Sequence, residues 1–122
     1  MAKSKEKIVD NATSYYDRLI DMHPTLKRKG KTMPYTSVNG HMFSFLDKDG
    51  VMGLRLPPEE RDAFIRKYKT RIMEQYGRVM AEYVVVPEKL LSDTLTLLKY
   101  LEKSYEYVSA LKPKKTTRSK KE

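Results

Sequence analysis

The sequence predicts an α+β fold, and three features of the chain lead to this class. Apolar residues recur at helical spacing near both ends of the chain. Two turn-forming dipeptides, Asn39-Gly40 and Asp49-Gly50, divide the middle into short β-forming runs, and a second β-forming pair surrounds Gly77. The expected order is helix, three strands, helix, two strands, helix. Such an order gives a mostly antiparallel five-stranded sheet with helices packed on one face.

The composition limits the classes of protein to consider. A chain of 122 residues with 39% hydrophobic content suits a single domain, which we expect over residues 1–111. The absence of cysteine excludes disulfides, thiol catalysis and cysteine-based zinc sites. No apolar run approaches the ~20 residues that span a bilayer, and the N-terminus carries no apolar signal segment. We therefore expect a soluble cytoplasmic protein.

The first helix is expected over residues 4–23. Its apolar residues are spaced by three and four positions, so they share one stripe; these are Ile8, Ala12, Tyr15, Leu19 and Met22. The helix should end at His23-Pro24, because the residue before a proline avoids the helical region. Residues 24–31 then form a basic connection.

The next three strands should be joined by two tight type I′ turns, because both dipeptides adopt positive φ angles readily. The first turn predicts the pairs Ser37 with Met42 and Tyr35 with Ser44. The second predicts the pairs Lys48 with Val51, Phe45 with Leu54 and Phe43 with Leu56. Both phenylalanines would then lie opposite leucines on one face of the sheet.

Pro57-Pro58-Glu59-Glu60 should start the second helix, with Ala63, Phe64 and Tyr68 on its buried side. Strands are expected at 71–76 and 79–86. The last helix lies within 88–111; Ser92-Asp93 either caps a fresh helix after a short turn, which we favour, or lies inside a continuous one. The predicted core consists of Ile8, Tyr15, Leu19, Phe43, Phe45, Leu54, Leu56, Phe64, Leu98, Leu101 and Tyr105.

The segment from Lys31 to Pro57, the helix after it and the run Tyr83–Glu88 resemble the TfoX (Sxy) N-terminal domain family. The clearest marks are the Asn39-Gly40 turn leading into Met42-Phe43 and the Val-Pro-Glu entry to the last helix. The resemblance covers roughly residues 25–110 and implies a small α+β domain. Larger members of that family regulate natural competence in bacteria, and many single-domain members have no assigned function. The family supplies no catalytic residues.

The net charge of +9 is concentrated in two segments. The connection around Lys27–Lys31 carries +4, and a disordered tail at 112–122 carries +5, so the remaining residues sum to zero. Both segments either bind a polyanion such as nucleic acid or simply solubilise the chain. The candidate polyanion-binding residues are Lys27, Arg28, Lys29, Lys31, Lys114, Lys115, Arg118, Lys120 and Lys121.

A second candidate site lies on the sheet. The first hairpin register places Met33, Tyr35, Met42 and Leu46 on the face opposite to the two phenylalanines. This apolar set is either an interface for a protein partner or a second copy of the chain, or it lies under a loop or the last helix.

The known catalytic and metal-binding motifs are missing or incomplete. Gly30-Lys31-Thr32 matches the end of a phosphate-binding loop, but position 25 is threonine where that motif needs glycine. Asp47–Gly50 has its glycine two positions too early for a calcium loop. Neither His23 nor His41 has a zinc-ligand spacing. The leading hypothesis is therefore a small cytoplasmic, non-enzymatic interaction or regulatory domain without cofactor or metal. A nucleic-acid-associated protein and an enzyme with a dispersed site are the alternatives.

Overall fold

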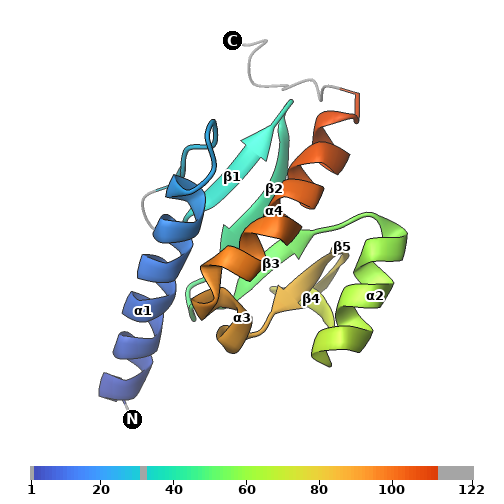
Figure 1. Cartoon of the computed structure of the whole chain (residues 1–122). Helices are drawn as coiled ribbons and strands as arrows, with labels where there is room; N and C mark the ends of the chain where they lie inside the picture. The colour runs from blue at the N-terminus through green and yellow to red at the C-terminus, as the bar shows by residue number, and fades with distance from the viewer. Residues whose placement is uncertain (1, 31–32, 113–122) are drawn as a thin grey trace, which may run out of the picture.

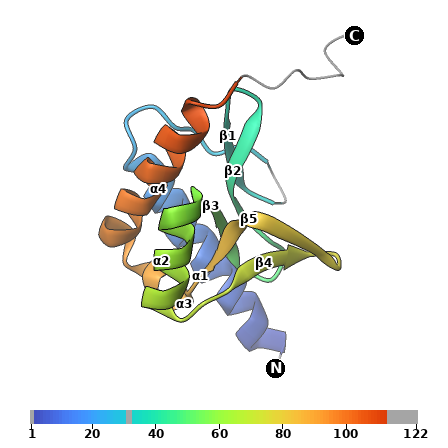
Figure 2. The ribbon, with the colours of Figure 1, turned by 90° about the vertical axis from the view of Figure 1, so that its right-hand side faces the viewer.

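A computed structural model describes residues 2–30 and 33–112, with the side chains of the first helix described from Asp10 onward. The elements follow one another as α1 (Ala2–Asp21), β1 (Tyr35–Val38), β2 (His41–Leu46), β3 (Met52–Arg55), α2 (Pro58–Tyr68), β4 (Ile72–Gln75), β5 (Arg78–Val86), α3 (Glu88–Ser92) and α4 (Thr94–Ser109). The five strands form one antiparallel sheet in the order β1-β2-β3-β5-β4. The helices cover one face, so the α+β prediction is confirmed (Figures 1 and 2).

The covered face holds the main core. Leu46, Met52 and Val86 form one rung across β2, β3 and β5, and all three side chains are buried beneath the helices. Helix α1 packs on this face through Leu19 and Ile20. The break before α4 is also confirmed, because the Asp93 carboxylate accepts a hydrogen bond from the Thr96 backbone N–H at 3.4 Å.

Some predicted core positions are displaced along the helices. On α1 the fully buried aromatic residue is Tyr16, whereas Tyr15 is half-buried, and on α4 Leu97 takes the place predicted for Leu98. Ala63 of α2 is exposed, contrary to prediction. On α1 and α4 the buried stripes are wider than the strict three-and-four spacing assumed, because each of these two helices packs against both the sheet and other helices. Ile8 lies outside the described side chains.

The first hairpin has the predicted turn but a different register. Asn39 and Gly40 have φ angles of 54° and 81°, and Ser37 pairs with Met42 as expected. Tyr35, however, pairs with Phe45 rather than Ser44, because Phe43 is left without a partner in β1 and forms a β-bulge. The bulge turns Phe43 toward the helices while Phe45 stays on the opposite face, so the two phenylalanines do not share a face.

The second hairpin is closed by a longer turn than predicted. Asp47, not Lys48, pairs with Val51, and the loop consists of three residues ending at Gly50 with φ 82°. The Asp47 carboxylate stabilises this turn by accepting backbone N–H bonds from Asp49 at 2.8 Å and Val51 at 2.9 Å. The register therefore shifts by one: Phe45 opposes Gly53 rather than Leu54.

A polar cluster lies inside the core between α1 and the first hairpin. The hydroxyls of Tyr16 and Ser44 lie 2.6 Å apart, and Thr36 bonds to the same serine from β1. All three side chains are fully buried. Each of the three hydroxyls is hydrogen-bonded to another member of the cluster. The cluster therefore fixes the position of α1 on the sheet without leaving one of these hydroxyls unpaired.

Tyr16 makes the stability of the fold depend on pH in the alkaline range. Burial raises the pKa of its hydroxyl above the ordinary value of 10.0. Above pH 10 the unfolded chain loses this proton while the folded chain retains it. The free energy of unfolding should therefore fall by up to about 1.4 kcal/mol per pH unit above pH 10, and this group should have no effect below.

The measurement is urea denaturation of the wild type, Tyr16→Phe and Tyr76→Phe between about pH 9 and 11. Tyr76 is 79% exposed and serves as the matched control. Tyr16→Phe should show a shallower decline than the other two proteins. Equal slopes in all three would contradict the assignment.

Candidate functional site

The face of the sheet opposite to the helices carries a second, smaller apolar cluster. Phe45, Met73 and Val85 are buried there, and Tyr35 and Met42 pack against them. Phe45, Gly53 and Val85 form the central rung of this face. Phe45 covers the glycine, since a β-carbon added at Gly53 would lie 2.6 Å from its ring. The glycine thus lets an aromatic ring lie flat across β3 and form a floor.

The hairpin of β4 and β5 builds a wall beside this floor. Between Ile72 and Met73 the pairing with β5 shifts, so that β5 contributes three more residues than β4. This irregularity bends the hairpin, whose tip at Tyr76-Gly77 projects from the body in Figure 2. The Gln75 amide donates to the Asp47 carboxylate at 3.1 Å and so ties the hairpin to the β2–β3 turn.

Floor and wall together enclose a groove of about 650 Å³, which we call the open-face groove. Its lining is Met33, Tyr35, Met42, Phe45, Gln75, Tyr76, Arg78, Val79 and Met80. Three of these nine side chains are methionines, which adapt their shape to whatever they contact. Among the described residues of this lining, Arg78 is the one side chain that carries a charge at neutral pH. The groove therefore suits an apolar ligand that carries negative charge.

Three of the four predicted interface residues line the groove, namely Met33, Tyr35 and Met42. The fourth, Leu46, is buried in the helix-covered core, and its assignment to the interface is wrong. The error comes from the bulge at Phe43, which shifts the inside–outside alternation of every later residue in β2. The β4–β5 half of the groove was not predicted from the sequence. The feature of the sequence that indicates this half is the presence of Tyr76 and Val79 at the tip of a hairpin, where polar residues are usual.

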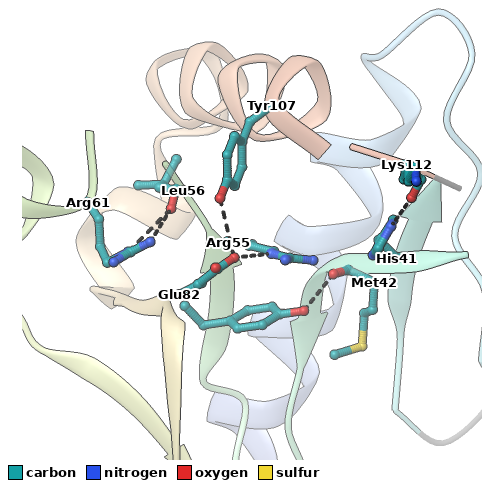
Figure 3. Close-up of polar contacts among 9 residues, drawn as sticks. His41, Met42, Arg55, Leu56, Arg61, Glu82, Tyr107 and Lys112 are labelled. Atoms are coloured by element: carbon teal, nitrogen blue, oxygen red, sulfur yellow. Dashed lines mark hydrogen bonds and ion pairs between the residues drawn. The ribbon is translucent and has the colours of Figure 1, made fainter. Parts of the chain in front are cut away.

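A side-chain hydrogen bond from β5 also holds β2 next to the bulge. The Tyr83 hydroxyl reaches across from β5 and donates a hydrogen bond to the Met42 carbonyl (Figure 3). Burial raises the pKa of Tyr83, so the hydroxyl stays protonated and available as a donor. This bond links β5 to β2 over the intervening strand and holds Met42 at the rim of the groove.

An ion pair lies next to Tyr83. Arg55 Nε lies 2.6 Å from Glu82 Oε1, joining β3 to β5, and the Tyr107 hydroxyl of α4 donates to the same carboxylate at 3.5 Å (Figure 3). The guanidinium carbon lies 6.0 Å from the centre of the Tyr107 ring. Each charge has an opposite partner, so this cluster fastens α4 to the end of the sheet.

The predicted basic loop lies at the edge of the sheet, and its cations are exposed. Arg28 pairs with Asp17 at 3.2 Å, Lys29 donates to Ser37 at 3.1 Å, and Lys27 is exposed. Lys29 also exchanges two backbone hydrogen bonds with Tyr35, of 2.8 and 2.9 Å, on the outer edge of β1. Two of the three described cations thus make local contacts within the fold.

The predicted tail begins beside the β1–β2 turn. His41 Nε2 donates to the Lys112 carbonyl at 2.8 Å, and the Asn39 amide donates to the Ser109 carbonyl at 3.0 Å. The remaining predicted polyanion-binding residues lie outside the described residues: Lys31, Lys114, Lys115, Arg118, Lys120 and Lys121.

His23 has a structural role in the described part of the chain. It is buried, and its Nδ1 accepts backbone N–H bonds from Thr25 at 3.2 Å and Leu26 at 3.3 Å. Its Nε2 therefore carries the proton and donates to Glu102 at 2.7 Å. The histidine shapes the chain reversal after α1. Within residues 2–30 and 33–112, no three histidine or acidic side chains are grouped as a metal site would require.

Comparison of the chain with protein-family models, curated proteins and solved structures found no match. The resemblance to the TfoX N-terminal domain family stays a prediction based on the motifs given above. Among the described helices, none combines the length and apolar character needed to cross a membrane.

The contact between Phe45 and Gly53 can be tested by substitution. Gly53→Ala should lower the free energy of unfolding by about 1–3 kcal/mol, because the new methyl group displaces the Phe45 ring from the floor of the groove. In a Phe45→Ala background the same change should cost much less. Urea denaturation of the four proteins of this double-mutant cycle gives the coupling energy. An equal cost in both backgrounds would contradict the contact.

Proposed function

We propose that the chain is a small cytoplasmic interaction domain, related to the TfoX N-terminal domain, that binds a segment of another protein in the open-face groove. Regulation through this contact, without chemistry of its own, is the function we infer. The observation that carries the proposal is the groove of about 650 Å³ on a sheet face that no described helix covers.

The exposure of apolar side chains on this surface supports a binding role. Tyr76 is 79% exposed and Val79 is 64% exposed, and both line the groove beside partly buried methionines. A monomer gains nothing by presenting such residues to water, whereas contiguous apolar patches commonly mark interaction sites. The groove lies within the size range of ligand sites, ≈ 300–1,000 Å³.

The charge of the chain favours a particular partner. The full sequence carries +9, and among the described residues of the lining Arg78 is the one charged side chain. Two copies meeting groove to groove would bring like charges together, which opposes association. A segment with apolar residues for the floor and a carboxylate for Arg78 would complement both properties. We therefore expect an acidic, apolar segment rather than a second copy of the chain.

The test uses two exposed apolar residues as a matched pair. Val79→Glu places a carboxylate in the groove, and Leu95→Glu places one on α4, where the native leucine is 73% exposed. Peptides selected from a random display library on the wild-type chain should be rich in acidic and apolar residues. Fluorescence anisotropy should show at least about tenfold weaker binding to Val79→Glu. Leu95→Glu should bind within about twofold of the wild type.

Two results would overturn the proposal. One is equal binding of the selected peptides to Val79→Glu and the wild type. The other is a wild-type dimer in size-exclusion chromatography with light scattering that Val79→Glu converts to a monomer, because the groove would then bind a second copy. Circular dichroism of both variants confirms that the fold is intact.

A further inference from the structure

A lysine-rich hollow lies on the helical side of the sheet, away from the open-face groove. It has a volume of about 400 Å³ and is lined by residues from the end of α2 and the start of α3. Lys67 and Lys69 come from α2 and its C-cap, and Lys89 comes from α3. Tyr68 forms part of the wall. Three ammonium groups from two separate elements therefore meet around one hollow.

The position of these lysines is not explained by helix formation alone. Cations near a helix C-terminus are favoured by its dipole, which accounts for Lys67. Lys69, however, occupies the C-cap with φ 53°, a conformation that costs a lysine more than a glycine. Lys89 belongs to another helix.

The positive charge of the hollow is not neutralised by the fold. The ion pairs between described residues involve other cations, such as Lys103 with Glu60 and Arg55 with Glu82. Asp93, the one acidic residue among the described lining of the hollow, accepts the capping bond from Thr96. Three lysines and one aspartate leave a charge of +2 (3 − 1) around the hollow. An anionic ligand would be attracted to it.

Tyr68 provides a fixed aromatic ring beside this charge. Its ring centre lies 4.8 Å from that of Phe64 and 5.8 Å from that of Tyr100, and its hydroxyl donates to the Tyr100 hydroxyl at 3.2 Å. Lys67 Nζ lies 5.5 Å from the centre of the Tyr68 ring. A rigid ring next to ammonium groups matches the two chemical parts of a nucleotide, a flat base and a phosphate.

The surrounding sequence favours a strand over a single nucleotide. Arg66 and Arg71 flank the hollow lysines in the run Arg66–Arg71, and both side chains are exposed. Positive charge therefore continues along the chain on both sides of the hollow lysines, which suits a backbone with several phosphates. This basic run was not predicted from the sequence, because the acidic residues of the same helix cancel its charge when the charges of all residues outside the loop and tail are summed.

We propose that the hollow between α2 and α3 binds single-stranded nucleic acid, with backbone phosphates on Lys67, Lys69 and Lys89 and a base against Tyr68. This site differs from the predicted basic loop, whose described residues 24–30 lie at the opposite end of the molecule (Figures 1 and 2). It is also independent of the open-face groove, so a protein segment and a strand could be bound together.

The main test measures anisotropy of a fluorescein-labelled oligothymidine of about twelve nucleotides with the full chain over a series of salt concentrations. Each phosphate contact to a single strand contributes about 0.7 to the slope of log K against log salt, so three contacts contribute about 2. The triple variant K67Q/K69Q/K89Q should lose about that slope and bind at least about tenfold more weakly at low salt. The variant K27Q/R28Q/K29Q removes the same charge from the loop and should retain both.

The role of the ring is tested separately. Tyr68→Phe keeps the aromatic surface and should bind within about twofold of the wild type, whereas Tyr68→Leu should bind about tenfold more weakly. Thermal unfolding of each variant checks that the fold persists. The lysine variants test the location of the site independently of the Tyr68 variants.

Several outcomes would overturn the proposal. No binding at low salt would exclude the site. An equal or larger loss in the loop variant would show that the strand responds to net charge or to the loop. Displacement of the oligonucleotide by adenosine monophosphate at comparable concentration would indicate a mononucleotide site.

Discussion

The structure depends on one irregularity, the β-bulge at Phe43. Because the bulge adds a residue to β2, Phe43 and Ser44 both face the helices, while Met42 and Phe45 face the other way. Without it, Phe43 and Phe45 would share a face, and either the core or the floor of the open-face groove would lose an aromatic ring. A single inserted residue thus supplies both faces of the sheet with a phenylalanine.

The bulge is stabilised from both sides of the sheet. On the helical side, the hydroxyls of Tyr16 and Thr36 hold Ser44. On the open side, the Tyr83 hydroxyl donates to the Met42 carbonyl next to the bulge. These partners come from three different elements, α1, β1 and β5, so the bulge is supported by contacts from outside its own hairpin. The open-face groove is therefore a product of the tertiary structure rather than of the hairpin alone.

Much of the fold could be predicted from the sequence, because its signals are local. Turn residues, prolines and the Asp93 cap act within a few positions, and they mark the ends of the elements in the right order. The hairpin registers could not be predicted, because they depend on interactions outside the turn dipeptides. Asp47 lengthens the second turn through its side chain, and the bulge at Phe43 depends on distant hydroxyls. One register error was enough to misplace Leu46.

The two candidate surfaces could also be predicted only in part, because each combines residues that are distant in the sequence. Half of the open-face groove came from the predicted hairpin, and the other half came from residues near Gly77 that only the bend of β5 brings close. Summing the charges along the sequence identified the basic loop. The net charge of the remaining residues is zero, however, and such a sum does not show where acidic and basic residues are separated locally. The acids Glu59 and Glu60 begin α2, and the lysines end it, so this helix is neutral in total and polarised along its length.

The contact between Lys29 and Tyr35 affects how copies of the sheet could assemble. Sheets grow into fibrils when both outer strands accept another chain. Here the backbone of Lys29 occupies the outer side of β1 at Tyr35, whereas no described segment pairs with the outer side of β4. Molecules that meet through β4 alone would use the same strand twice, and such a pairing closes on itself. An assembly built through β4 alone is thus a finite pair rather than an endless polymer.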